Sequence, residues 1–172
     1  GSAGKSFSLT GWKVGYITAP AHLMDVIAKA HQFLTFTTAP NLQKAVAFGL
    51  GKLDDYFASL ASELQAKRDL LSDGLRNIGF DILPSEGTYF IAADFRKFAK
   101  PGEDDLAFCK RITVEAGVAA VPFSAFSMAT SPGFENAPPP SDTLIRFCFC
   151  KRDEVLIDAA GRLRRHLTGV GE

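Results

Sequence analysis

Lys5 is the first residue of the chain whose surroundings suggest chemistry, in the opening stretch GSAGKSFSLTGWKVGY. Gly4, Lys5 and Ser6 match the end of the phosphate-binding loop G-x-x-x-x-G-K-[ST], whose lysine contacts nucleotide phosphates. That loop must lead into a helix whose N-terminus faces the phosphates. The residues that follow, FSLTGWKVGY, contain two glycines and several strand-forming residues, so they argue against a nucleotide site.

Ser2 and Lys13 flank Lys5 with a hydroxyl and a second cation, a combination that suits a phosphate group. Ala3 and Gly4 are small and leave room beside Lys5 for a bulky partner. A lysine that forms a Schiff base with an aldehyde cofactor needs such room, and it needs a nearby anchor for the cofactor phosphate. These residues therefore leave two interpretations open, a cofactor-binding lysine and a solvated surface lysine.

Arg146 is the second candidate, because it is a lone charge in the apolar stretch TLIRFCFC. Strand alternation separates this stretch into one face with Leu144, Arg146, Cys148 and Cys150 and another with Ile145, Phe147 and Phe149. An arginine in such a strand is costly unless it has a partner. The partner is either an acidic side chain in a buried ion pair or a substrate carboxylate, which guanidinium geometry suits.

The elements that must position these residues follow from hydrophobic periodicity and from turn residues. Helices and strands alternate in a pattern typical of an α/β protein. The predicted strands cover residues 12–19, 80–85, 88–95, 118–123 and 143–150, and the predicted helices cover 20–34, 40–50, 54–78, 103–116 and 153–167. The proline-rich stretch 130–142 has the composition of an exposed loop or lid.

The composition of the 172 residues limits the function further. Hydrophobic residues make up 47% and charged residues 22%, as in globular proteins, and 19 basic residues balance 19 acidic ones. We therefore expect neither a nucleic-acid partner nor a membrane partner. Three cysteines are too few for a disulfide framework, which favours a reducing, cytoplasmic location. Because the chain begins inside a motif and without Met, we expect it to be the C-terminal part of a longer protein.

The stretch GSAGKSFSLTGWKVGY resembles the lysine motif of class I/II aminotransferases, pyridoxal-phosphate enzymes of fold type I, and it is most similar to the kynurenine/glutamine and methionine branch. The segments HQFLTFTTAPNLQ, SEGTYFIAADF and IRFCFCKRDEVL resemble later parts of the same family in the same order. The resemblance implies an α/β fold. It also implies that residues 1–30 end the large cofactor-binding domain and that residues 31–172 form the small C-terminal domain.

The resemblance also implies a role for each candidate. Lys5 would form the Schiff base with pyridoxal 5'-phosphate and act as general base and acid, while Ser2 and Lys13 would hold the cofactor phosphate. Arg146 would bind the α-carboxylate of an amino acid, whose amino group passes to a 2-oxo acid in a ping-pong reaction. The family implies a homodimer. A carbon–sulfur β-lyase on the same scaffold and a non-catalytic regulatory domain remain alternatives.

Other residues carry weaker signals. Cys148 and Cys150 share a strand face, but no pair of ligands has the spacing of a zinc site, so we expect no metal and interpret both as core cysteines. Tyr89, Phe123 and Phe126 are candidates to approach a substrate side chain, although we favour a place in the aromatic core for all three.

Overall fold

The computed structural model describes residues 1–127 and 142–169. Its internal contacts divide the chain into two units, Gly1–Leu60 and Ala61–Glu172, and we describe each unit by itself. The domain boundary predicted between residues 30 and 31 falls inside the helix Ala21–Leu34. The two units group residues by their contacts within this chain, whereas the predicted boundary separates two domains of a longer protein. The assignment of residues 1–30 to a large domain therefore stays a prediction.

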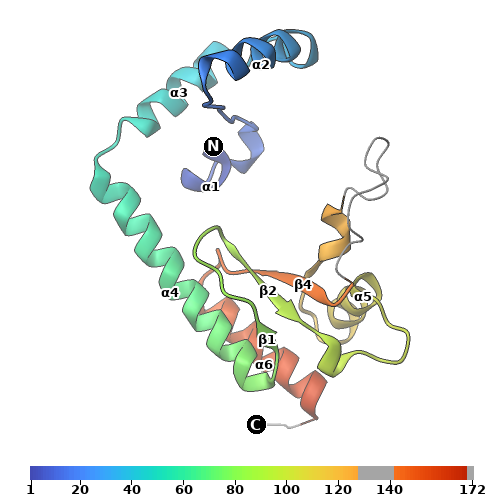
Figure 1. Cartoon of the computed structure of the whole chain (residues 1–172). Helices are drawn as coiled ribbons and strands as arrows, with labels where there is room; N and C mark the ends of the chain where they lie inside the picture. The colour runs from blue at the N-terminus through green and yellow to red at the C-terminus, as the bar shows by residue number, and fades with distance from the viewer. Residues whose placement is uncertain (128–141, 170–172) are drawn as a thin grey trace. The chain divides into compact units, whose positions relative to one another are not determined.

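The N-terminal unit is helical (Figure 1). It contains the single turn α1 (Ala3–Ser6), the 3-10 turn η1 (Thr10–Trp12), α2 (Ala21–Leu34), α3 (Pro40–Leu50) and the first turns of α4 (Asp54–Ile78). The helices predicted over 20–34, 40–50 and 54–78 are thus confirmed. Pro40 occupies the first turn of α3, where its missing N–H costs no hydrogen bond.

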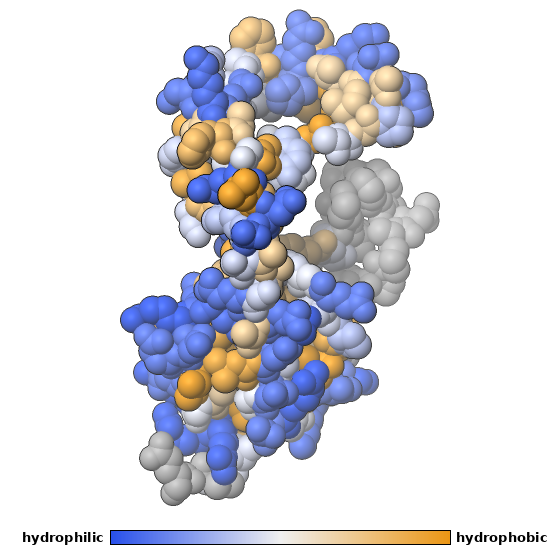
Figure 2. All heavy atoms as spheres, turned by 90° about the vertical axis from the view of Figure 1, so that its left-hand side faces the viewer, coloured by the Kyte–Doolittle hydropathy of each residue, from blue (hydrophilic) through white to orange (hydrophobic). Residues whose placement is uncertain are grey.

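Many large hydrophobic side chains of this unit are exposed. Figure 2 shows hydrophobic surface, in orange, on its helices. The most exposed of these side chains are Val26, Phe33, Leu34, Phe36, Phe48 and Leu53.

The strand predicted over residues 12–19 is wrong. Trp12 ends η1, and the following residues make only an isolated antiparallel bridge between Ser2 and Gly15. Two backbone bonds flank this bridge, from Ala3 N to Val14 O at 3.0 Å and from Tyr16 N to Gly1 O at 2.9 Å. A strand needs a neighbour over several residues, and among the described residues only Gly1–Ala3 pair with this segment.

The C-terminal unit is built on a four-stranded antiparallel sheet with the order β1-β2-β4-β3. The strands are β1 (Asp81–Ile82), β2 (Phe90–Asp94), β3 (Val121–Pro122) and β4 (Leu144–Cys148), each inside a predicted strand but shorter. Most of α4, together with α5 (Asp105–Glu115) and α6 (Asp153–Thr168), supplies the helices, as predicted. Short 3-10 turns, η2 (Arg96–Phe98) and η3 (Phe123–Phe126), follow β2 and β3.

The sheet has one buried face and one open face. Ile91 and Ala93 of β2 and Ile145 and Phe147 of β4 are buried in a single core with side chains of all three helices. The helical members of this core include Leu71, Leu75, Ile78, Phe108, Ile112, Leu156 and Leu163. The alternate residues of β2 and β4 are only partly buried, so the alternation predicted for 143–150 is confirmed.

The loop predicted over residues 130–142 lies almost wholly outside the described residues. Within the part of the chain that the structure describes, no helix is both long and apolar enough to cross a bilayer.

Candidate functional site

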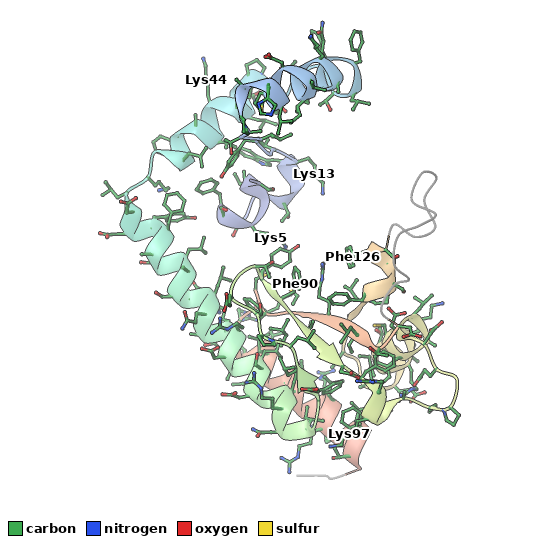
Figure 3. All side chains as sticks on the ribbon, viewed as in Figure 1. Lys5, Lys13, Lys44, Phe90, Lys97 and Phe126 are labelled. Atoms are coloured by element: carbon green, nitrogen blue, oxygen red, sulfur yellow. The ribbon has the colours of Figure 1, made fainter. Side chains whose placement is uncertain are left out.

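The segment Gly1–Tyr16 carries the three polar candidates of the N-terminal unit. Ser2 is the N-cap of α1, and its Oγ accepts a hydrogen bond from Gly4 N at 3.2 Å. Lys5 is exposed in the same helical turn. Lys13 follows η1 with φ of 54° and ψ of 40°, which ends the turn and directs the next residues back toward Gly1. Figure 3 shows that the side chains of both lysines project outward from this segment.

Two sets of contacts hold the backbone around Lys5. Ala3 and Val14 are buried against Val46 of α3, which ties both ends of the segment to that helix. On the other side, the hydroxyl of Tyr56 donates to the carbonyl of Ser6 at 2.7 Å, at the end of the turn that carries Lys5.

An aromatic cluster completes this support. The ring of Phe7 stacks on Tyr56 with centroids 5.9 Å apart and meets Phe57 edge-on at 6.2 Å. The distal edge of the Phe7 ring lies against Gly49, where an added Cβ would lie 3.0 Å from Phe7 Cζ. Lys5 is thus presented by a turn whose backbone is held on both sides by these contacts.

Arg146 lies at the centre of β4, on the open face of the sheet and paired in register with Ala92 of β2 and Val121 of β3. Two phenyl rings flank its guanidinium, with centroids 4.0 Å (Phe90) and 4.2 Å (Phe126) from Cζ. Phe90 belongs to β2, on one side of β4, and Phe126 belongs to η3, which follows β3 on the other side. Their labels in Figure 3 mark the position of this sandwich between β2 and η3.

No acidic side chain forms an ion pair with Arg146 within residues 1–127 and 142–169. Both rings contact the guanidinium by cation–π interaction but offer no hydrogen-bond acceptor. Its N–H groups lie along the edge of the plane, where a carboxylate binds in bidentate fashion. The sequence left two possible partners for Arg146, an acidic side chain and a substrate carboxylate. Among the described residues, no acidic side chain pairs with it.

The other candidates divide. Phe126 is 55% exposed, so its predicted place in the aromatic core is wrong, whereas Tyr89 packs partly buried against the core. Cys148 and Cys150 are half-buried rather than core residues, and their sulfurs lie 3.2 Å apart. The described residues contain no group of three side chains that could hold a metal ion.

Comparison with known proteins agrees with these features. A model of the family "aminotransferase class I and II" matches residues 1–163. Methionine aminotransferase of Escherichia coli is 41% identical over 164 residues, which are 95% of this chain and 40% of that protein. Kynurenine–oxoglutarate transaminase of Dictyostelium discoideum is 35% identical over 179 residues, with coverages of 95% and 40%. The chain belongs to the class I and II aminotransferases.

Solved aminotransferase structures share the fold of this chain. Escherichia coli YbdL, identified as a methionine aminotransferase, superposes with a TM-score of 0.77 at 40% identity, covering 94% of this chain and 40% of YbdL. N-succinyldiaminopimelate aminotransferase of Mycobacterium tuberculosis gives the same TM-score and identity, with coverages of 95% and 40%. The predicted fold type I is thus confirmed, and the chain spans about 40% of the length of these relatives.

The residues of this aminotransferase chain fit the cofactor of the family, pyridoxal 5'-phosphate. A hydroxyl and an ammonium group, from Ser2 and Lys13, are donors that suit a phosphate, and Lys5 supplies the amine that an aldehyde requires. Gly4 keeps space beside the serine, because a Cβ at Gly4 would lie 3.3 Å from Ser2 Oγ. No acidic residue pairs with Lys13 in the described part of the chain.

The structure brings Ser2, Lys5 and Lys13 into one segment of the N-terminal unit and places Arg146 in the C-terminal unit. Sequence reasoning did not identify Phe90 or Tyr56 as parts of the site. Phe90 alternates with the buried Ile91 along β2, so it lies on the open face of the sheet. Its place near Arg146 can be predicted once the register of β2 with β4 is known. The hydrogen bond from Tyr56 to Ser6 joins residues fifty positions apart, and no local pattern predicts it.

Proposed function

We propose that the complete protein containing this chain is a pyridoxal-phosphate-dependent aminotransferase that moves the amino group of an L-amino acid to a 2-oxo acid. The observation that carries the proposal is the environment of Arg146. Its guanidinium is held on an open sheet face between two rings, without an acidic partner among the described residues. A cation kept in this way is available for a carboxylate, the group that both substrates share.

The N-terminal unit would bind the cofactor. The Ser2 hydroxyl and the Lys13 ammonium group would donate to its phosphate, and Lys5 Nζ would bond covalently with its aldehyde carbon. When bound, pyridoxal phosphate supplies an electron-withdrawing ring that acidifies the proton on the α-carbon of the substrate. Lys5, once freed by the substrate amine, would take that proton on Nζ and deliver it to the cofactor's C4′ within the same half-reaction.

The remaining expectations also belong to this proposal. Class I and II aminotransferases are typically dimers, and we propose a homodimer. We propose a cytoplasmic location because three cysteines are too few for a disulfide framework, as is usual in a reducing compartment.

The test for Lys5 is borohydride reduction of the complete protein with pyridoxal phosphate, followed by peptide mapping. The expected result is a pyridoxyl group on Lys5, with Lys13→Ala weakening cofactor binding and the distant α3 variant Lys44→Ala leaving it unchanged. Reduction onto another lysine would overturn the assignment.

The test for Arg146 is the Michaelis constant for the amino donor in Arg146→Leu, with a panel of donors and 2-oxo acids. Loss of a charge-assisted bidentate contact should raise KM by about 10- to 100-fold. Arg152→Leu is the matched control, because Arg152 is exposed and pairs with Glu154 at 2.8 Å. Release of pyruvate, ammonia and a thiol in place of amino transfer would identify the β-lyase, and absence of turnover in the loaded protein would favour the regulatory domain.

A further inference from the structure

Asp105 is a buried carboxylate that the proposed mechanism does not use. It is the first residue of α5, and its side chain is 2% exposed. Within the described part of the chain, no lysine, arginine or histidine forms an ion pair with it. A buried charge without a counter-ion is costly, so its hydrogen bonds must account for its place in the fold.

Both oxygens of this carboxylate bind one residue. Asp105 Oδ2 accepts from Ser124 N at 2.7 Å, and Oδ1 accepts from Ser124 Oγ at 2.9 Å. The positive end of the α5 dipole also favours a negative charge at this position. Asp105 therefore fixes both the backbone and the side chain of Ser124, nineteen residues away.

Ser124 lies in η3, the 3-10 turn that also carries Phe126. Phe126 is 55% exposed, so burial does little to hold its ring in place. The turn begins directly after Pro122 of β3, and the two bonds to Asp105 are its attachment to α5. The position of the Phe126 ring over the guanidinium of Arg146 thus depends on an anchor outside the sheet.

We propose that Asp105 is a positioning residue for Arg146, acting through Ser124 and Phe126. Its carboxylate holds η3 so that the Phe126 ring stays in contact with the guanidinium, which the Phe90 ring also contacts. With both rings against it, the Arg146 side chain is held in place and does not have to be ordered when a carboxylate binds to its N–H groups. The inference rests on the proposed function, in which Arg146 binds the substrate carboxylate.

Kinetics of the complete protein test this inference with Asp105→Asn, which keeps the shape of the side chain but replaces one acceptor oxygen by an NH₂ group. We expect the donor KM to rise about three- to tenfold, the effect of losing one buried hydrogen bond, with kcat nearly unchanged. Ser124→Ala, which removes only the hydroxyl bond, should give a smaller rise in KM. Asp104→Asn is the matched control, because the exposed Asp104 only caps α5 through Ala107 N, and asparagine caps equally well.

A double variant separates positioning from general destabilisation. If Asp105 acts through the ring, Asp105→Asn should add little to the KM of Phe126→Leu, because the ring is already gone. Additive effects of the two substitutions would overturn the inference. The NMR shifts of the Arg146 side-chain protons give a second measure: Asp105→Asn and Phe126→Leu should move them in the same direction, away from the wild-type ring-current position.

The outcomes distinguish this inference from the proposed function. A raised KM in Arg146→Leu together with wild-type KM and NMR shifts in Asp105→Asn overturns the role of Asp105 alone. An unchanged KM in Arg146→Leu overturns the proposed role of Arg146 itself. If Asp105→Asn does not fold, Ser124→Ala alone tests the role of Asp105. A KM equal to that of the wild type, together with unchanged Arg146 NMR shifts in this variant, would then overturn the inference.

Discussion

Replacing Glu103 by glutamine should destabilise the structure around α5 by about 3 kcal/mol, as is usual when one partner of a buried ion pair is removed. Glu103 and Arg111 are 8% and 10% exposed, so solvent screens their interaction little. Arg111 Nε donates to Glu103 Oε1 at 2.7 Å and its Nη2 donates to Oε2 at 2.8 Å. A glutamine would place an NH₂ group against one of these N–H donors and remove the carboxylate that pairs with the guanidinium.

The same pair predicts a dependence on pH. The Arg111 guanidinium, opposing the effect of burial, lowers the pKa of Glu103 below its ordinary value of 4.5. A carboxyl whose pKa is lower in the folded state stabilises the fold above the pKa of the unfolded state, and this stabilisation is lost as the pH falls through the folded pKa. The difference between wild type and Glu103→Gln should therefore be full at pH 7 and shrink below about pH 4.5.

Hydrogen exchange of the α5 amides in the complete protein measures this local stability without assuming two-state unfolding. A loss of about 3 kcal/mol should speed exchange by about 100-fold at pH 7. Asp73→Asn is the control, because its pair with Arg76 is 71% and 54% exposed and should contribute less than about 1 kcal/mol. Equal exchange in Glu103→Gln and wild type, or an effect that grows as the pH falls, would refute the reasoning.

Two further predictions concern a buried thiol and the support of Lys5. Burial, with a smaller contribution from the charge of Asp105, raises the pKa of Cys109 from 9.0 to about 12. At pH 8 only about one molecule in ten thousand would then hold the thiolate, so iodoacetamide should not modify Cys109 in the native protein. A carbamidomethyl group mapped to Cys109 after treatment of the native protein would contradict this. Tyr56→Phe removes the hydrogen bond to Ser6 O, at a cost of about 1 kcal/mol. It should raise the dissociation constant for pyridoxal phosphate about fivefold and leave the hydrogen exchange of the α5 amides unchanged. An unchanged dissociation constant would show that this bond does not support Lys5.

Periodicity predicted most of the fold because the core of the C-terminal unit is made by regular faces. Leu71, Leu75 and Ile78 follow one another at helical spacing on α4, and all three are buried. Gly79 follows with φ of +112°, a conformation that glycine adopts without strain and that suits the end of this helix. The strand expected at 12–19 failed because β-type residues indicate an extended chain but do not supply a neighbouring strand.

The candidate site was less predictable, because its geometry depends on contacts between distant residues. The sequence could place Arg146 on one strand face and could state which partners would satisfy it. It could not decide between these partners, because the two rings that contact the guanidinium come from distant positions. Phe90 precedes Arg146 by 56 residues and Phe126 precedes it by 20. The role of Ser2 as the N-cap of α1 was also missed, although serine is among the preferred residues at that position.

The orientation of Arg146 is set by its hydrophobic neighbours in the strand. Ile145, Phe147 and Phe149 are each at most 4% exposed, and burying each contributes about 1.5–3 kcal/mol. A slip of β4 by one residue would expose all three and turn the guanidinium into the core, where it would be costly. The packing of these three side chains therefore selects the register that leaves Arg146 on the open face, between the two rings. A substitution such as Phe147→Ala should for this reason disturb substrate binding as well as stability, although Phe147 faces away from the site.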